Sequence, residues 1–240
     1  MTKQLTALIT GGGSGIGEAT SKILLENNYK VISVGLHIPS WTKENFEAIE
    51  LDLLDLKKTK VLADQICERE NITHFVHNAG MILPNFIEDM AVEDLSTLTS
   101  LHAGAALVFI QSFLESMKND KFGRIIFNSS RASLGLETRS AYSYSKAGII
   151  GMARTWALEL APYGITVNSI CPGPVLTNNF WDLVKKDSPE QEAAAARIPV
   201  GRLGKPEDVA RAIKFFSDPE NDFITGQTLY VCGGLSIASG

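Results

Sequence analysis

The sequence predicts an α/β protein built on one doubly wound parallel sheet of about seven strands, with helices on both faces. Short runs rich in Val, Ile and Leu alternate with longer segments of helical periodicity, a pattern typical of right-handed βαβ units. A glycine-rich turn also follows the first apolar run directly. With 240 residues and 45% hydrophobic content, the chain can bury one sizeable core, so we expect a single domain over residues 1–240.

The expected strands are residues 5–10, 30–34, 47–51, 74–77, 123–128, 165–170 and 227–231. Two long helical patterns, at residues 92–118 and 141–162, precede the fifth and sixth strands. The crossover at residues 37–50 is too short for a full helix. Ligands of such sheets bind beyond the carboxyl ends of the strands, so residues that directly follow a strand are the candidates for a site.

The first strand leads into the glycine-rich turn Thr10-Gly11-Gly-Gly-Ser-Gly-Ile-Gly17 and then into a helical pattern. Glycines let the backbone approach a pyrophosphate closely, and free N–H groups and the helix dipole then meet its charge. A P-loop would need Lys in place of Glu18, and Gly-x-Gly-x-x-Gly fails in every register. We therefore predict dinucleotide binding, against the alternative of a turn without ligand, by Gly11, Ser14, Gly15, Ile16 and Gly17.

Tyr142 and Lys146 stand four residues apart in a helical pattern, so both project from one face of the helix. A neighbouring ammonium favours the phenolate, which brings a phenol toward the range where it exchanges protons at neutral pH. The pair can therefore do acid–base chemistry, although such spacing also arises by chance on a solvated helix. Tyr144 cannot make the same pair, because Gly148 stands four residues after it.

Five motifs in this order resemble the short-chain dehydrogenase/reductase family. They are the glycine turn, Asn78-Ala79-Gly80 after the fourth strand, Tyr-x-x-x-Lys with an upstream serine, Pro172-Gly173-Pro174-Val175-Leu-Thr177 after the sixth strand, and a tail at residues 198–234 that is similar to bacterial 3-oxoacyl reductases. The resemblance covers almost the whole chain. It implies a Rossmann-type fold and NAD(P)(H)-dependent hydride transfer between nicotinamide and a carbonyl or secondary alcohol.

The resemblance assigns catalytic roles to three side chains. Tyr142 would be the general acid in reduction and the base in oxidation, and Lys146 would lower the phenol's pKa and hold the nicotinamide ribose. Ser130 would hydrogen-bond the carbonyl oxygen as charge develops there. The strand alignment favours Ser130, whereas the usual family interval before the tyrosine gives Ser129, and strand alternation lets only one of them face the cofactor. A serine that merely ends the strand is the alternative without catalysis.

The resemblance assigns further residues to the cofactor. Beyond the glycine turn they are Asp52, Leu53, Asn78, Ala79, Gly80, Tyr142, Lys146, Pro172, Gly173, Val175 and Thr177. The second strand is followed by Gly35-Leu-His37, which offers neither a carboxylate for the ribose of NAD nor an arginine for the phosphate of NADP. Because no carboxylate would repel a phosphate, we expect NADP(H) to be preferred, with NADH as the alternative.

One family position differs in this chain. Many members carry a fourth catalytic residue, an Asn three positions before a glycine of the long helix, and here Gly104 places Leu101 there. The family Asn acts largely through its backbone carbonyl, which holds a relay water, so either Leu101 keeps that route or His102 substitutes. A lone histidine in an apolar helix more often serves packing.

The segments that would form the substrate pocket, residues 81–84, 131–139 and 178–196, suggest an apolar carbonyl or alcohol substrate. Arg131 and Arg139 could hold an anion, although loop arginines are more often solvated. A 3-oxoacyl-thioester reductase is the alternative within the same class, and a nucleotide-binding regulator without turnover is the alternative outside it. Family analogy implies a homotetramer through the two long helices, in which the small residues 103–106 would permit close packing.

Composition argues against several classes of partner. A net charge of −5 and a pI near 5.4 do not suit a nucleic-acid surface. The first strand is expected within about five residues of the start and no uncharged apolar stretch approaches about 20 residues, so we expect a cytoplasmic protein without membrane contact. Cys67, Cys171 and Cys232 lack Cys-x-x-Cys spacing and are expected to be buried apolar side chains, with no metal site.

Overall fold

Seven parallel strands form one sheet in the order β3-β2-β1-β4-β5-β6-β7. The structure, a computed structural model, describes residues 4–238. The strands are β1 (Thr6–Thr10), β2 (Lys30–Gly35), β3 (Phe46–Glu50), β4 (His74–His77), β5 (Gly123–Asn128), β6 (Ile165–Pro172) and β7 (Thr228–Val231). The doubly wound parallel sheet is therefore confirmed, and each predicted strand overlaps its observed counterpart.

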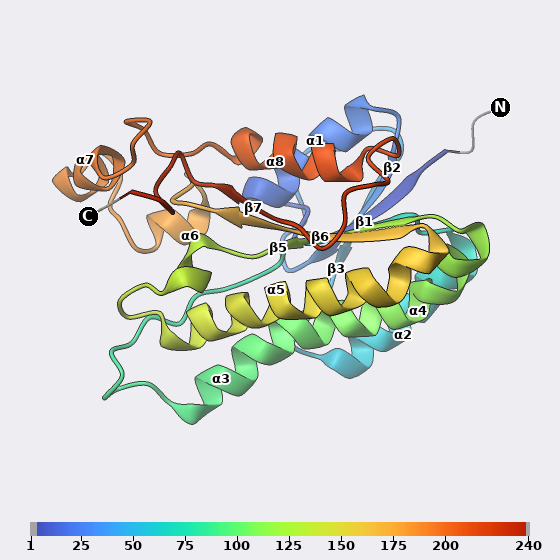
Figure 1. Ribbon diagram of the computed structural model, residues 1–240, viewed down its shortest axis with the longest axis horizontal. Coiled ribbons are helices and arrows are strands. Elements are labelled where there is room, and N and C mark those ends of the chain that lie inside the picture. The colour runs from blue at the N-terminus through green and yellow to red at the C-terminus, as the bar shows by residue number, and fades with distance from the viewer. Residues whose placement is uncertain (1–3, 239–240) are drawn as a thin grey trace.

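Helices cover both faces of this sheet (Figure 1). α1 (Gly15–Glu26) and α8 (Pro206–Ser217) pack together on one face, and α2 (Leu56–Arg69), α4 (Ala105–Asp120) and α5 (Ser140–Leu160) lie on the other. Each face has its own apolar core, because successive residues of a strand point to opposite sides. Phe75 of β4 packs with Phe109 and Phe113 in one core, while Val76 packs with Ile213 in the other.

The long helix at residues 92–120 is not regular along its length. α3 (Val92–Thr99) passes into α4 through the π-helical turn η1 (Ser100–Gly104), which carries both Leu101 and His102. The sequence predicted one helix over residues 92–118 and gave no sign of this turn. π-Helical turns widen the helix locally and occur often at functional sites.

Residues Val92–Asp120 have the length and mean hydropathy that a membrane-spanning helix needs. Phe109, Phe113 and Met117 are nevertheless buried against the sheet, so this segment is a core helix of the fold. Ala105 and Ala106 are buried in the same core, and Gly104 faces Leu56 of α2. Ala105 and Ala106 therefore face the chain's own interior, whereas Ala103 and Gly104 are half-buried, and packing of residues 103–106 against another subunit stays a prediction.

The remaining elements are short. They are the 3-10 turns η2 (Arg131–Leu134) and η3 (Ala161–Tyr163), and the helices α6 (Asn178–Trp181) and α7 (Pro189–Ala196). The structure has no helix between β2 and β3, as the length of that crossover predicted. α6, α7 and η2 surround one end of the sheet (Figure 1), where the carboxyl ends of the strands lie.

The opposite end of the sheet is closed by buried polar contacts. His74 Nε2 lies 2.9 Å from Ser217 O, and the Arg124 guanidinium donates to Pro219 O at 2.8 Å. These contacts fasten the end of α8 to the central strands.

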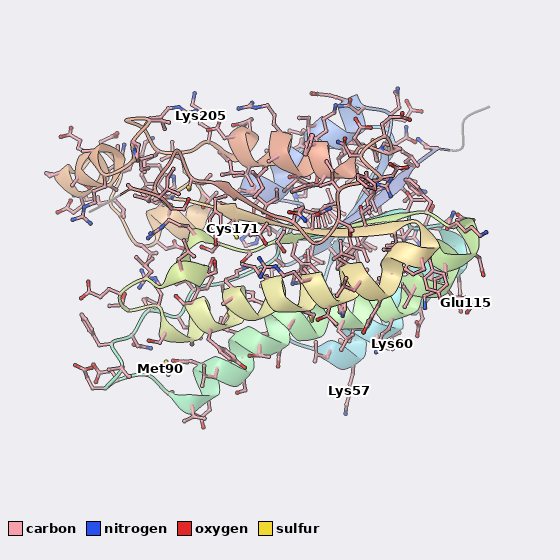
Figure 2. The ribbon with its side chains drawn as sticks, viewed as in Figure 1. Lys57, Lys60, Met90, Glu115, Cys171 and Lys205 are labelled. Atoms are coloured by element: carbon pink, nitrogen blue, oxygen red, sulfur yellow. The ribbon has the colours of Figure 1, made fainter. Side chains whose placement is uncertain are left out.

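Cys67, Cys171 and Cys232 are free thiols. Cys171 lies within the molecule, whereas the labelled Lys57 side chain points outward (Figure 2). Burial raises the pKa of the Cys171 thiol, so this side chain is held in its neutral form. Within residues 4–238 no group of three His, Cys, Asp or Glu side chains could hold a metal ion.

Candidate active site

A cavity of 680 Å³ lies beyond the carboxyl ends of the strands. Its walls contain every predicted site residue except Gly17: Gly11, Ser14, Gly15, Ile16, Asp52, Leu53, Asn78, Ala79, Gly80, Ser130, Tyr142, Lys146, Pro172, Gly173, Val175 and Thr177. Residues from six loops and helices thus converge on one space, as expected for a ligand site of an open parallel sheet.

The glycine turn joins β1 to α1 at one side of this cavity. Gly11 has φ +65°, which favours glycine, and its backbone passes close to that of Ala79. A Cβ on Gly17 would lie 2.0 Å from Gly11 O, so Gly17 shapes the turn instead of lining the cavity. Ser14 is extended, and its side chain does not cap α1. The first N–H groups of α1 therefore remain available to a phosphate, and the turn fits the predicted pyrophosphate.

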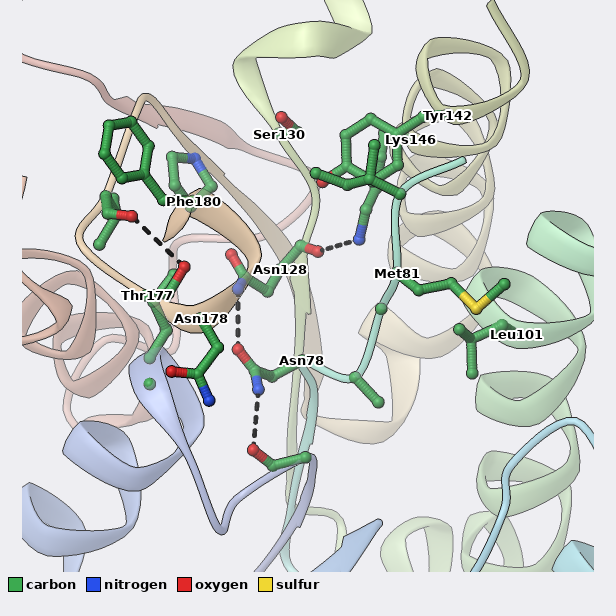
Figure 3. Close-up of a pocket in the computed structure, with 18 of the residues that line it drawn as sticks. Asn78, Met81, Leu101, Asn128, Ser130, Tyr142, Lys146, Thr177, Asn178 and Phe180 are labelled. Atoms are coloured by element: carbon green, nitrogen blue, oxygen red, sulfur yellow. Dashed lines mark hydrogen bonds between the residues drawn. The ribbon is translucent and has the colours of Figure 1, made fainter. Parts of the chain in front are cut away.

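A network of side-chain hydrogen bonds connects the carboxyl ends of β1, β4 and β5 (Figure 3). Thr10 Oγ1 accepts from the backbone N–H of Asn78 and of Ala79, at 2.9 and 3.0 Å. Asn78 Nδ2 donates to Gly11 O at 3.2 Å, and Asn128 Nδ2 donates to Asn78 Oδ1 at 2.8 Å. The glycine turn is thereby held in fixed register with β4 and β5. Sequence analysis did not assign a site role to Thr10 or Asn128, although each is the last residue of a strand.

Lys146 is buried in the wall of the cavity. Its Nζ donates to Asn128 O at 2.8 Å, which aims the amine toward the end of β5 (Figure 3). Burial lowers the pKa of Lys146 to about 7. The side chain can therefore gain and lose a proton near neutral pH, which an exposed lysine cannot do.

Tyr142 lies one turn before Lys146 on α5, and Lys146 Nζ is 5.6 Å from the centre of its ring. Burial raises the pKa of Tyr142 to about 12, and hydrogen bonding by Ser130 and the charge of Arg139 oppose this shift. The expectation that Lys146 lowers the phenol's pKa is not met in the protein without ligand. Burial outweighs the effects that would lower the phenol's pKa, and Lys146 is not among the groups that shift it.

The two adjacent serines have different partners. Ser129 is buried, and its Oγ donates to Lys146 O at 2.7 Å, so this hydroxyl fastens β5 to α5. Ser130 Oγ accepts from Ala132 N at 3.1 Å and lies beside Tyr142, close enough to influence the phenol's pKa. Of the two alternatives left by the sequence, the geometry favours Ser130.

The position of the missing family Asn is occupied by a hydrogen-bonded turn. Leu101 O lies 3.1 Å from His77 Nε2, and His77 Nδ1 lies 3.0 Å from Thr10 Oγ1. Because a carbonyl can only accept, His77 carries its proton on Nε2. Burial lowers the pKa of His77 to about 3, so the ring stays neutral. The sequence gave no reason to single out His77, since nothing in a strand pattern shows which side chain a distant helix will contact.

Residues 35–37 and 52–53 form another part of the cavity wall. A Cβ on Gly13 would lie 2.0 Å from His37 O, so the segment after β2 folds directly against the glycine turn. No carboxylate stands at residues 35–37, where β2 ends beside the cavity. Asp52 Oδ1 accepts from Leu54 N at 3.0 Å, so one of its oxygens is engaged in a local turn while the residue lines the cavity.

The wall of the cavity beside Tyr142 is largely apolar. It is lined by Met81, Ile82, Leu136, Phe180, Leu183 and Val184. Arg131 and Arg139 also line the cavity, and burial lowers the pKa of Arg139, which Tyr142 opposes. The sequence left Arg139 as either an anion ligand or a solvated loop arginine. Its place three residues before Tyr142, at the start of α5, was the signal that could have indicated its closeness to the phenol.

Comparisons with known proteins agree with this geometry. The family profile described as Enoyl-(Acyl carrier protein) reductase matches residues 11–236. Subunit BbsD of (2S)-[(R)-hydroxy(phenyl)methyl]succinyl-CoA dehydrogenase from Thauera aromatica is 33% identical, covering 98% of this chain and 97% of that protein. The 3-oxoacyl-[acyl-carrier-protein] reductase FabG of Rickettsia bellii is 33% identical, covering 96% of each. The solved structure of ElxO with NADP bound has a TM-score of 0.88 at 25% identity, covering 97% of this chain and 98% of ElxO.

The chain belongs to the short-chain dehydrogenase/reductase family and is an oxidoreductase close to its 3-oxoacyl reductase branch. Four of the five motifs that resembled this family in the sequence line one cavity at the carboxyl ends of the strands. The family profile and the solved structures confirm the predicted membership and Rossmann-type fold.

Proposed function

We propose that this protein transfers a hydride between a nicotinamide dinucleotide and a carbonyl or secondary alcohol carbon, with Tyr142 as general acid and base. The observation that carries the proposal is the convergence of Ser130, Tyr142 and Lys146 on a cavity that also contains the glycine turn. A regulator that only binds nucleotide needs the turn but not these three side chains. The convergence therefore favours an enzyme over the regulator alternative.

Each of the three side chains has a distinct task. A bound nicotinamide would supply the hydride in reduction and accept it in oxidation. Tyr142 donates its phenolic proton to the substrate oxygen in reduction and takes it back in oxidation. Ser130 donates a hydrogen bond to that oxygen as negative charge develops on it. Lys146, with a pKa near 7, supplies positive charge and a replaceable proton behind the phenol.

For the cofactor, we propose a preference for NADP(H) over NAD(H). The absence of a carboxylate after β2 supports this, since an acid there would bind the ribose of NAD and repel an added phosphate. The structural neighbour ElxO carries NADP. The ratio of kcat/KM for NADPH to that for NADH tests the preference, and a ratio below one would reject it.

For the substrate, we propose an apolar ketone or secondary alcohol, because the wall beside Tyr142 is mostly apolar. A second candidate is a 3-oxoacyl thioester, which is favoured by relatives whose names specify an acyl-CoA and an oxoacyl carrier protein. Assays with an acetoacetyl thioester and with a panel of aromatic and alicyclic ketones separate the two. A kcat/KM at least about tenfold higher for the thioester would select the second candidate.

We also propose a homotetramer formed through α4 and α5. Leu158 on α5 is 81% exposed, Leu107 on α4 is 41% exposed, and the positions beside Gly148 and Gly151 are open. Apolar and flat surfaces on neighbouring helices suit contact with a second copy. The cytoplasmic location stays a prediction from the sequence.

Tyr142→Phe tests the proposed acid–base role. We expect turnover to fall at least about a hundredfold while the affinity for NADPH stays within a few-fold, because the ring remains and only the transferable proton is lost. Steady-state kinetics and fluorescence titration with NADPH measure the two quantities. Tyr144→Phe is the matched control, since Tyr144 is 60% exposed and should tolerate the change. Equal turnover in the two variants would reject the role of Tyr142.

A further inference from the structure

Arg139 is an arginine of the cavity wall without an acidic partner. It stands three residues before Tyr142, lines the cavity and is half-buried. Burial lowers the pKa of Arg139 and the phenol of Tyr142 opposes this shift, while no carboxylate among residues 4–238 contributes to it. A guanidinium that is partly removed from water without a counter-charge is unfavourable. This side chain is therefore suited to an anion that a ligand supplies.

The Arg139 guanidinium is held in place by the residue before it. Nη1 donates to Thr138 O at 3.2 Å and also to Thr138 Oγ1. Thr138 O accepts from Asn85 N as well, at 3.0 Å, which connects this segment to the loop after β4. Thr138 has φ +62°, a left-handed conformation that a β-branched residue rarely adopts. Such conformations persist where the surrounding structure imposes them, often at ligand sites.

The bonds to Thr138 leave one edge of the guanidinium free. They occupy Nη1, whereas no residue in the described part of the chain accepts from Nε or Nη2 of Arg139. The N–H groups of Nε and Nη2 point in the same direction, and together they match the two oxygens of a carboxylate. The free edge therefore indicates a carboxylate as the missing anion.

The charges around the cavity suit a negatively charged substrate. The lining contains Arg131, Arg139 and Lys146, and Asp52 is the one acidic residue that the described part of the chain contributes to it. Asp52 follows the edge strand β3, and β2, β1 and β4 lie between β3 and β5. With a strand spacing of about 4.8 Å, its charge is roughly 19 Å from the end of β5, where Ser130 lies. Positive side chains at the reaction centre attract and orient an anionic substrate.

We propose that Arg139 binds a carboxylate of the substrate through Nε and Nη2, so that the substrate is an oxo acid, or the corresponding hydroxy acid, with an apolar group. Reduction adds a hydride from the nicotinamide to the carbonyl carbon and a proton from Tyr142 to the carbonyl oxygen, and the carboxylate stays unchanged. The inference names the substrate class of the proposed function and rests on that function.

The position of Arg139 limits the distance between the two groups of the substrate. Arg139 O accepts from Ser143 N at 2.6 Å, so the helical turn that carries Tyr142 includes Arg139. Residues three apart in a helix have Cβ atoms about 5–6 Å apart. A carbonyl at Tyr142 and a carboxylate at Arg139 are therefore separated by only a few bonds, and the apolar wall near Phe180 and Leu183 receives the rest of the molecule.

Three aryl oxo acids and their methyl esters test the inference. Phenylglyoxylate, benzoylacetate and 4-oxo-4-phenylbutanoate place the carboxylate at increasing distance from the same aryl ketone, and esterification removes only the charge. We expect at least one acid to exceed its ester by at least about tenfold in kcat/KM, with NADPH or NADH, whichever gives the higher rate.

Arg139→Gln should lower this acid-to-ester ratio at least about tenfold, mainly through a higher KM for the acid. The ratio cancels any effect of the lost charge on the phenol, since that effect is common to acid and ester. Arg139→Lys should give an intermediate ratio, because an ammonium keeps the charge but not the two parallel donors.

Two other arginines serve as controls. Arg211→Gln removes the same charge from α8, where the side chain is 61% exposed, and should leave the ratio as in the wild type. Arg131→Gln removes the other arginine of the cavity wall and should lower the ratio less than Arg139→Gln does. An equal or larger fall in either control would overturn the assignment to Arg139.

Calorimetric titration gives a test that does not depend on turnover. Tyr142→Phe with bound NADPH should bind the preferred acid at least about tenfold more tightly than its ester, and adding Arg139→Gln should abolish the difference. Turnover of ketones and esters without any preference for the acids would overturn the inference and leave the proposed function intact. Binding of the acids through Arg139 without turnover of any acid, ester or ketone by the wild type would reject the proposed function instead.

Discussion

Ser129 and Ser130 show how one residue of displacement changes a side chain's task. Both are serines at the end of β5, but strand alternation sends Ser129 toward the backbone of α5 and Ser130 toward the phenol. Sequence spacing alone supported each of them. The family interval counted back from Tyr142 gives Ser129, whereas the strand alignment gives Ser130, so spacing alone did not separate the two.

Replacing each serine with alanine should give different losses. Ser130→Ala removes a hydrogen bond to the developing oxyanion, so we expect kcat to fall about a hundredfold with the melting temperature nearly unchanged. Ser129→Ala removes the side-chain hydrogen bond to Lys146 O, so it should lower the free energy of unfolding by about 0.5–1.5 kcal/mol while kcat falls much less. Steady-state kinetics and denaturant unfolding of both variants check this. The reverse pattern would assign the catalytic hydroxyl to Ser129.

Lys146 gives the protein a stability that depends on pH. Its folded pKa is about 7, below the value of 10.5 in the unfolded chain. Between these values the unfolded state binds more protons, so stability rises with pH, by at most about 1.4 kcal/mol per unit. The useful window is pH 7 to 9, because Tyr142, with a pKa raised to about 12 from 10.0, acts in the opposite sense only above pH 10.

Lys146→Met should remove this rise. We expect the difference in unfolding free energy between pH 9 and pH 7, measured without cofactor, to become smaller than in the wild type. Lys57→Met changes an outward-facing lysine on α2 and is the control, for which the difference should stay as in the wild type. An unchanged slope in the Lys146 variant would mean that Lys146 stays charged when buried.

At the scale of elements, the sequence predicted those features that depend on local chemistry. The glycine turn, the Asn78–Gly80 segment and Tyr142 with Lys146 each combine residue type with position after a strand or on one helix face. The π-helical turn η1 was not predictable, because residues 100–104 contain no Pro, and Gly104, a residue that helix interiors tolerate, does not specify a π-helical turn. Its geometry depends on the contact of Leu101 O with His77, which lies 24 residues earlier on another element.

The same limit applies to residues 103–106. Small residues permit close packing, but their sequence does not say which neighbour approaches. Here α2 and the sheet approach, and the exposed apolar side chains lie elsewhere on α4 and α5.

Leu158→Glu tests the proposed interface. Placing a charge on the exposed face of α5 should dissociate a tetramer built through that face, because burying an unpaired carboxylate costs several kcal/mol. Size-exclusion chromatography with light scattering measures the mass. Val61→Glu, an exposed apolar position on α2, should leave the mass unchanged. A tetramer that survives Leu158→Glu, or a wild-type monomer, would contradict the assignment.

For the whole molecule, buried histidines link the architecture to acid stability. His74 connects β4 to the end of α8, His77 connects β4 to η1, and His102 connects η1 to Ser145 of α5. Burial lowers the pKa of His74 and of His77 to about 3 and shifts His102 in the same direction. The fold therefore depends on three neutral rings that would be charged in the unfolded chain at acid pH.

This arrangement predicts that stability falls as the pH drops below 6.5. The unfolded state then binds more protons than the folded state, and each histidine removes about 1.4 kcal/mol per pH unit once its unfolded form is protonated. The window from pH 6.5 to 5 isolates them from the carboxylates, since the shifted Asp208, with a pKa lowered to about 2 from 3.8, contributes its loss only below pH 4. Urea unfolding at several pH values measures the slope. His74→Gln should reduce the slope of the unfolding free energy against pH by the contribution of one histidine. Equal unfolding free energies at pH 7 and pH 5 would show that these rings accept protons in the folded state.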